Sequence, residues 1–160
     1  MKKIILMLIC ATGYIFTGQA QELSDNAIGL RLGGANGYGA EISYQHLLGA
    51  NHRLEVDLGF RNERDYNSFK LTGLYQWVWN IDGGFNWYAG LGAGVGSVNI
   101  KHHHHHGGAF AFIAGNLGIE YDFNVPLQVF IDFRPEIGFS DYDVYDNFGP
   151  DLALGIRYRF

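Results

Sequence analysis

The chain has 160 residues, of which 16% are aromatic and 23 are glycine, and its 16 acidic residues outnumber 11 basic ones. This surplus of negative charge argues against a nucleic-acid partner, because phosphate backbones are bound by basic surfaces. Beyond the first 20 residues no apolar run reaches the roughly 18 residues of a membrane-spanning helix, so the sequence excludes a helical membrane protein.

The first 20 residues have the pattern of a secretory signal peptide. Lys2 and Lys3 are positive, residues 4–16 are almost wholly apolar, and residues 18–20 end in the small side chains that cleavage requires. A retained anchor is disfavoured, because a spanning helix needs roughly 20 apolar residues. Cys10 raises the alternative of a lipoprotein, but branched Ile9 stands where such sites want a small residue. We expect residues 1–20 to be a cleaved signal peptide and residues 21–160 to form one cysteine-free domain.

Short segments that alternate apolar and polar residues follow the signal, as is typical of β-strands. The alternation is clearest in residues 127–139, where Val129 and Ile131 alternate with Asp132 and Arg134. A period of two places the two sets on opposite faces of a sheet. Eight such segments are expected, at about 27–34, 38–47, 53–62, 67–80, 85–99, 109–123, 127–139 and 151–160.

The connections between these segments alternate in length. Residues 48–51, 81–84 and 124–126 form tight turns, whereas residues 62–67, 101–108 and 140–150 form longer polar loops. Residues 35–37 depart from this pattern, because a long loop is expected there and the segment is short. The pattern predicts an all-β, eight-stranded antiparallel up-and-down barrel, whose even strand number returns both termini to the same side.

A soluble sandwich or lipocalin-like barrel is the alternative to a transmembrane barrel. The positions of the aromatic residues favour the transmembrane barrel. They fall in two bands separated by aliphatic and small residues, and aromatic residues are enriched in this way at the two interfaces of a bilayer. The band near the tight turns and the C-terminus comprises Tyr44, Tyr75, Trp77, Trp79, Phe85, Trp87, Tyr121, Phe123, Tyr158 and Phe160. The band near the longer loops comprises Phe60, Phe69, Phe110, Phe139 and Tyr142.

Charged residues of both signs share the second face of the strands. They are expected to form an ion network that fills the lumen, because eight strands enclose an interior just wide enough for side chains. No open pore is therefore expected. The expected network comprises Arg31, Glu41, Glu55, Asp57, Arg61, Glu120, Asp132, Arg134, Glu136 and Arg157, with Lys70 and Asp122 of the same parity.

The chain ends in the run 155–160, with a glycine, apolar residues at alternate positions and a final aromatic. This run resembles the terminal signal of outer-membrane barrels, carried here by Gly155, Tyr158 and Phe160, although Ala153 stands where that pattern prefers a polar residue. Over its mature length the chain resembles small OmpA/OmpX-type outer-membrane barrels of the version common in Bacteroidetes-like bacteria. The resemblance implies a bacterial outer-membrane location, both termini in the periplasm, contact with lipid and lipopolysaccharide, and recognition by the barrel-assembly machinery.

A histidine run is the most conspicuous candidate site. Its members are His102, His103, His104, His105 and His106, in a segment expected to be a loop. Imidazoles on a flexible loop can bind zinc, nickel or copper. The alternatives are a solvated polar loop or an inserted purification tag. No cofactor is expected beyond adventitious zinc or nickel.

An enzyme of the lipid A deacylase kind would need a serine and a histidine within reach of each other. Ser43 is expected on the opposite face from His46, and Ser97 and Ser140 have no histidine nearby except the loop run. No enzyme is therefore expected, and the inward carboxylates are interpreted as structural ion pairs. Three functions remain: a structural or surface-interaction barrel with an unidentified extracellular partner, a metal- or ligand-binding surface protein, and a lipid A-modifying enzyme.

Overall fold

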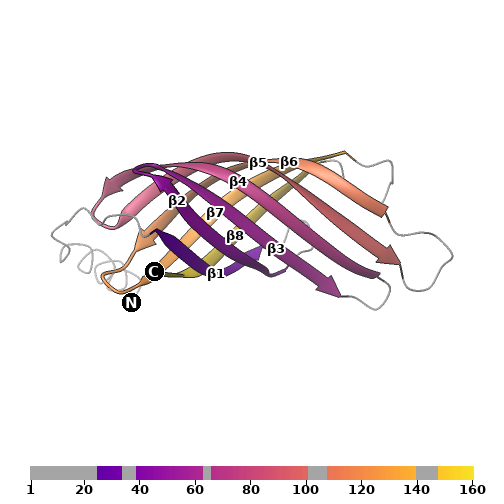
Figure 1. Cartoon of the computed structure of the whole chain (residues 1–160), viewed down its shortest axis with the longest axis horizontal. Coiled ribbons are helices and arrows are strands. Elements are labelled where there is room, and N and C mark those ends of the chain that lie inside the picture. Colours follow the sequence, from indigo (N-terminus) through magenta and orange to yellow (C-terminus); the bar gives the residue numbers. More distant parts are fainter. Residues whose placement is uncertain (1–24, 34–38, 63–65, 101–107, 140–147) are drawn as a thin grey trace, which may run out of the picture.

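The computed structural model describes residues 25–33, 39–62, 66–100, 108–139 and 148–160, which fold into one closed β-barrel (Figure 1). Each strand pairs antiparallel with its neighbours in sequence, and the last strand pairs with the first. This confirms the expected all-β, eight-stranded antiparallel barrel. The strands are β1 (Asn26–Gly33), β2 (Glu41–Gly49), β3 (His52–Asn62), β4 (Tyr66–Asp82), β5 (Phe85–Ile100), β6 (Gly108–Asp122), β7 (Leu127–Phe139) and β8 (Phe148–Arg159).

The strand boundaries differ from expectation mainly at β2 and β8. β2 begins at Glu41 rather than near residue 38, because Gly39 and Ala40 have little β-propensity and lie exposed outside the strand. β8 begins at Phe148, three residues earlier than expected, because its pairing with β7 continues through Pro150. No helix in the described part of the chain is long and apolar enough to cross a membrane.

Two short connections show how the sequence sets the turns. Gly83 joins β4 to β5 with φ of 53°, a left-handed conformation that glycine adopts without steric cost. Asn80 supports this turn by donating from Nδ2 to the carbonyls of Gly83 and Phe85, each at 3.2 Å. Between β6 and β7 the amide of Phe123 donates to the carbonyl of Leu127 at 3.0 Å.

The barrel closes between its two terminal strands. β1 and β8 pair from Ala27 opposite Arg159 to Gly33 opposite Ala153. The amide of Asn26 donates to the Phe160 carbonyl at 3.0 Å, and the amide of Phe160 donates to the Asn26 carbonyl at 2.9 Å. Both ends of the barrel chain therefore lie on one rim, and the sheet has no open edge between β1 and β8.

Exposure alternates with a period of two along the strands, and the polarity is inverted relative to a soluble protein. Charged and amide side chains are buried inside, whereas aliphatic side chains cover the outer wall. Aromatic contacts on the wall include the stacked Trp79 and Trp87 rings, 4.3 Å apart near the tight turns, and the Phe60 and Phe69 rings, 5.6 Å apart near the longer loops.

The expectation that Phe110 belongs to the outer aromatic band near the longer loops was wrong, because its side chain is buried in the lumen. Phe110 and Phe112 lie against Gly96 and Gly94 of the neighbouring β5, where any Cβ would overlap the rings. The inward glycines of β5 thus make room for large side chains of adjacent strands. Leu74, Phe110, Phe112 and Ala114 form a small apolar core on this side of the lumen.

The charged lumen as the candidate functional site

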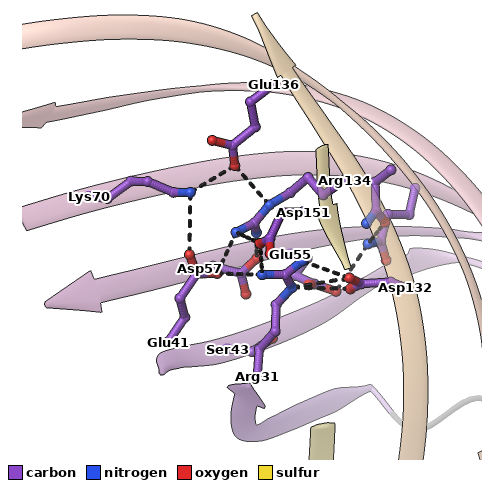
Figure 2. A network of polar contacts seen from close by, with 12 residues as sticks. Arg31, Glu41, Ser43, Glu55, Asp57, Lys70, Asp132, Arg134, Glu136 and Asp151 are labelled. Carbon is purple, nitrogen blue, oxygen red and sulfur yellow. Dashed lines mark hydrogen bonds and ion pairs between the residues drawn. The ribbon is translucent and has the colours of Figure 1, made fainter. Parts of the chain in front are cut away.

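The rest of the inner wall carries charged side chains. They face inward because alternate residues along each strand point to the same face of the sheet. We call one group the central cluster, a set of three cations and five carboxylates (Figure 2). Its members are Arg31, Lys70 and Arg134 with Glu41, Asp57, Asp132, Glu136 and Asp151. They come from β1, β2, β3, β4, β7 and β8, so the network connects strands that are far apart in sequence.

Arg31 organises one side of the central cluster. Its Nη2 donates to Asp132 Oδ1 at 2.7 Å, and its Nε contacts both Asp132 oxygens at 3.2 and 3.3 Å. Its Nη1 donates to Asp151 at 2.6 Å and to Glu41 at 3.2 Å. The guanidinium is fully buried, and paired donors of this kind give strong, geometrically specific contacts.

Arg134 organises the other side. Its Nη1 donates to Asp57 Oδ2 at 2.7 Å, its Nη2 donates to Glu41 Oε2 at 2.5 Å, and its Nε lies 3.0 Å from Glu136. Lys70 also contacts Glu136 at 2.8 Å and Glu41 at 3.4 Å. Figure 2 shows these side chains converging from opposite walls of the barrel, so the cluster crosses the lumen.

Three further ion pairs, which we call the turn-side pairs, each match one cation with one carboxylate. They are Arg53 with Glu120, Arg157 with Glu55, and Arg159 with Asp122, at 2.8, 3.0 and 3.3 Å respectively. Arg53 and Arg157 also lie over aromatic rings, with the Arg157 guanidinium carbon 3.5 Å from the centre of the Phe130 ring. Such stacking adds favourable contact for a desolvated guanidinium.

Buried amides link the turn-side pairs to the walls. Gln76 accepts from Arg53 Nε at 2.6 Å and donates to Asn116 at 2.7 Å. Gln45 donates to Glu55 at 2.5 Å, and Gln128 donates to Asp122 at 2.9 Å. These amides add hydrogen bonds to carboxylate oxygens that also pair with Arg157 and Arg159, and such bonds offset part of the cost of burying charge.

Near the tight turns the described side chains leave little free space in the lumen. A cavity of about 10 Å³ lies among Ala27, Gln45, Leu47, Arg53, Asp122, Gln128 and Arg159, and it has room for about one water molecule. The arrangement can therefore hold the walls together across the lumen, and it provides no wide passage at this level.

The structure buries every residue of the expected network except Arg61, which is half-buried near the loop end of β3. Arg53, Asp151 and Arg159 are members of the network that were not predicted from the sequence. All three share the parity of neighbouring inward residues, Glu55 on β3 and Arg157 on β8, so the alternation already contained the signal that would have found them.

The other candidate residues are dispersed. His102, His103, His104, His105, His106 and Ser140 lie outside the described residues. Ser43 faces the lumen and accepts from Arg157 Nε at 3.2 Å, whereas the exposed His46 lies on the outer wall with Nδ1 2.9 Å from Asn26 Oδ1. This serine and this histidine are therefore separated by the barrel wall. Ser97 is half-buried near the loop end of β5.

The C-terminal residues divide between the two faces. Tyr158 and Phe160 are exposed on the outer wall with ring centres 6.3 Å apart, whereas Gly155 leaves space for the Phe130 ring inside. Ala153 is buried close to Gly33, where a Cβ would lie 3.0 Å from that of Ala153. The close approach of β1 and β8 explains why a small residue stands at position 153.

No protein-family model and no curated protein sequence matches the chain. Solved structures match its fold. The N-terminal β-barrel domain of Pseudomonas aeruginosa OprF has a TM-score of 0.70 and 13% identity, covering 88% of this chain and 100% of that domain. Neisserial surface protein A has a TM-score of 0.60 and 11% identity, covering 84% and 94% of the two chains. The attachment invasion locus protein Ail of Yersinia pestis has a TM-score of 0.57 and 16% identity, covering 86% and 97%. These similarities show that the chain has the fold of small bacterial eight-stranded barrels.

Proposed function

We propose that this chain spans the bacterial outer membrane as a closed barrel with a structural or surface-interaction role. The observation that carries the proposal is the inverted polarity of the barrel. Outer-wall residues such as Leu91 and Leu152 are 65% and 62% exposed, while charged residues such as Arg134 are fully buried. In water, so large an apolar surface would drive association, whereas lipid covers it and requires the closed hydrogen bonding seen here.

The proposal includes an orientation, which the lengths of the connections and the positions of the two ends support. We place the tight turns and both termini in the periplasm, and the segments around 34–38, 63–65, 101–107 and 140–147 outside the cell. The mutual hydrogen bonds of Asn26 and Phe160 support one common side for the two ends. The pattern of residues 1–20 supports export and removal of that segment, which leaves a barrel domain at 21–160.

The surface-interaction role rests on the proposed orientation and on the names of similar structures. One of these is called a surface protein and another an attachment invasion locus protein. A catalytic role has less support, since the described serine and histidine candidates Ser43 and His46 lie on opposite faces of the wall. A lumen filled by ion pairs also disfavours a pore.

Cysteine labelling tests the compartment and the orientation. Cys10 is the only cysteine and lies in the segment proposed to be removed, so the mature chain provides a clean background. In a Gram-negative host, His104→Cys should react on intact cells with a membrane-impermeant maleimide, whereas Asn124→Cys in the β6–β7 turn should react only after the outer membrane is opened. Equal labelling of both variants on intact cells, or labelling of neither, would contradict the proposal.

A further inference from the structure

The central cluster contains more negative than positive charge. Five buried carboxylates face three buried cations, an excess of two negative charges within the described residues. The turn-side pairs, by contrast, match one cation to one carboxylate each. Uncompensated charge is expensive on side chains that are buried, as all eight members of the cluster are, so the cluster needs additional positive charge.

Asp57 is the carboxylate with the least compensation in the cluster. It contacts a single cation, Arg134, through Oδ2, and its Oδ1 has no hydrogen-bond partner in the part of the chain that the structure describes. Asp132 also contacts a single cation, but it takes three hydrogen bonds from Arg31. Each of the other carboxylates contacts at least two cations. Arg134 is moreover shared with Glu41, Glu136 and Asp151.

The residues beside Asp57 on the neighbouring strands do not provide a second cation in contact with it. Its partners in register on both neighbouring strands are uncharged, namely Ser43 on β2 and Thr72 on β4. The Thr72 hydroxyl is fully buried and also has no hydrogen-bond partner among the described residues. Glu55 projects into the lumen two residues away on the same strand. Further charged groups lie around Asp57, namely Glu55 on β3, Glu41 on β2, Arg134 on β7 and Arg157 on β8 and, beyond them, Lys70 on β4, Arg31 on β1 and Asp151 on β8. Of these four cations, Arg134 is the one that forms an ion pair with Asp57 among the described residues, and the other three pair with other carboxylates.

From this arrangement we propose that Asp57 carries a proton in the folded barrel at neutral pH. A proton fits better than a metal ion, because the described residues include no group of three or more His, Cys, Asp or Glu arranged to hold one. On folding, the Asp57 carboxylate takes one proton from water, which converts it to a neutral carboxylic acid. The acid keeps Oδ2 as an acceptor for Arg134 and removes one of the two excess charges.

The proposal has a definite pH dependence. The unfolded chain ionises Asp57 near pH 4, whereas the folded barrel keeps the proton, so folding takes up one proton between about pH 4 and the pH at which Asp57 ionises in the barrel. Because the unfolded state then binds fewer protons than the folded state, stability falls as pH rises through that window. Above the window the decline stops.

Infrared spectroscopy of the folded barrel in lipid vesicles tests the proposal directly. The expected spectrum at pH 7 contains the carbonyl stretch of a protonated carboxylic acid, and this band shifts when aspartate carries ¹³C in its side-chain carboxyl. Asp57→Asn should remove the band. The matched control Asp132→Asn, which changes another buried aspartate bound to an arginine, should leave it in place.

Stability gives a second readout. Asp57→Asn preserves the neutral state, so its folding equilibrium constant at pH 7 should change less than twofold, whereas Asp132→Asn should lower that constant more than tenfold. If Asp57→Asn does not fold, Asp57→Glu keeps an acid at the site, and its band should lose sensitivity to the aspartate label. A wild-type spectrum without the band, a band unaffected by the label, or a labelled band that persists in the position 57 variant would overturn the proposal.

Discussion

At the scale of single residues, Arg134 has the largest number of ionic partners in the lumen that the structure describes. It contacts Asp57, Glu41, Glu136 and Asp151 while fully buried. Arg134→Met should destabilise the barrel by about 3–5 kcal/mol, because several buried carboxylates lose their shared cation. Urea unfolding in detergent micelles measures the loss. Arg134→Lys, which retains the charge, is the control and should lose less; equal stability of the Met variant and the wild type would show that the site is solvated.

The close packing against the inward glycines of β5 predicts that a larger residue there destabilises the barrel. A Cβ on Gly94 would overlap the Phe112 ring and lie 2.6 Å from the Leu71 carbonyl oxygen. Gly94→Ala should therefore destabilise the barrel by about 1–3 kcal/mol, the usual cost of overpacking. Gly73→Ala is the matched control, because Gly73 faces outward and its Cβ would come no closer than 3.9 Å to a neighbouring atom. Equal unfolding midpoints for the two variants would contradict the packing described for this wall.

At the scale of strands, the depth of an outward residue sets its tolerance for charge. Ile131 lies near the middle of β7, paired with Leu154 on the outer wall, whereas Val125 is exposed in the adjacent tight turn. Ile131→Arg should cost about 2–4 kcal/mol and Val125→Arg about 0–1 kcal/mol, because the lipid penalty falls from the midplane to the interface. Unfolding from lipid vesicles compares them. The membrane placement would be wrong if Val125→Arg were the more costly change.

The histidine run at 102–106 gives a prediction that is independent of the described barrel wall. Replacing His102, His103, His104, His105 and His106 by serine should abolish zinc and nickel binding while leaving the unfolding midpoint unchanged, if the imidazoles of this run are the ligands. Binding in the parent should weaken as pH falls through about 6.5, where free imidazoles take up protons. Calorimetry on the folded protein decides: metal affinity that survives the replacement places the site elsewhere.

The strand pattern explains what the sequence could and could not predict. A period of two was enough to assign Glu55 and Asp57 to the inner face, because that property is local. The partners of Arg31, which include Asp132 on β7 and Asp151 on β8, depend on strand register and the stagger of the closed barrel. Phe110 was misassigned because nearness to a loop suggested a membrane interface, whereas the space beside Gly96 holds its ring inside.

At the scale of the whole molecule, the ion pairs across the lumen predict that the barrel does not conduct ions. Purified barrels in a planar bilayer at neutral pH should show no lasting ionic current, because ion pairs cross the lumen and the described cavity holds about one water molecule. Combined Arg31→Ala, Lys70→Ala and Arg134→Ala substitutions should increase conductance in any variant that still folds, because they empty the central cluster of its long cationic side chains. A steady large current in the unmodified protein would show that the lumen is open.

The pairing of β1 with β8 has a consequence for the timing of assembly. Ala27 and Arg159 are neighbours across the closing seam although almost the whole domain separates them along the chain. The wall cannot be completed until the final strand has been synthesised, so until then the outward leucines and isoleucines belong to a barrel that cannot close. A premature stop before β8 would leave β1 and β7 each without one partner strand, and the product would be a substrate for proteases rather than a smaller barrel.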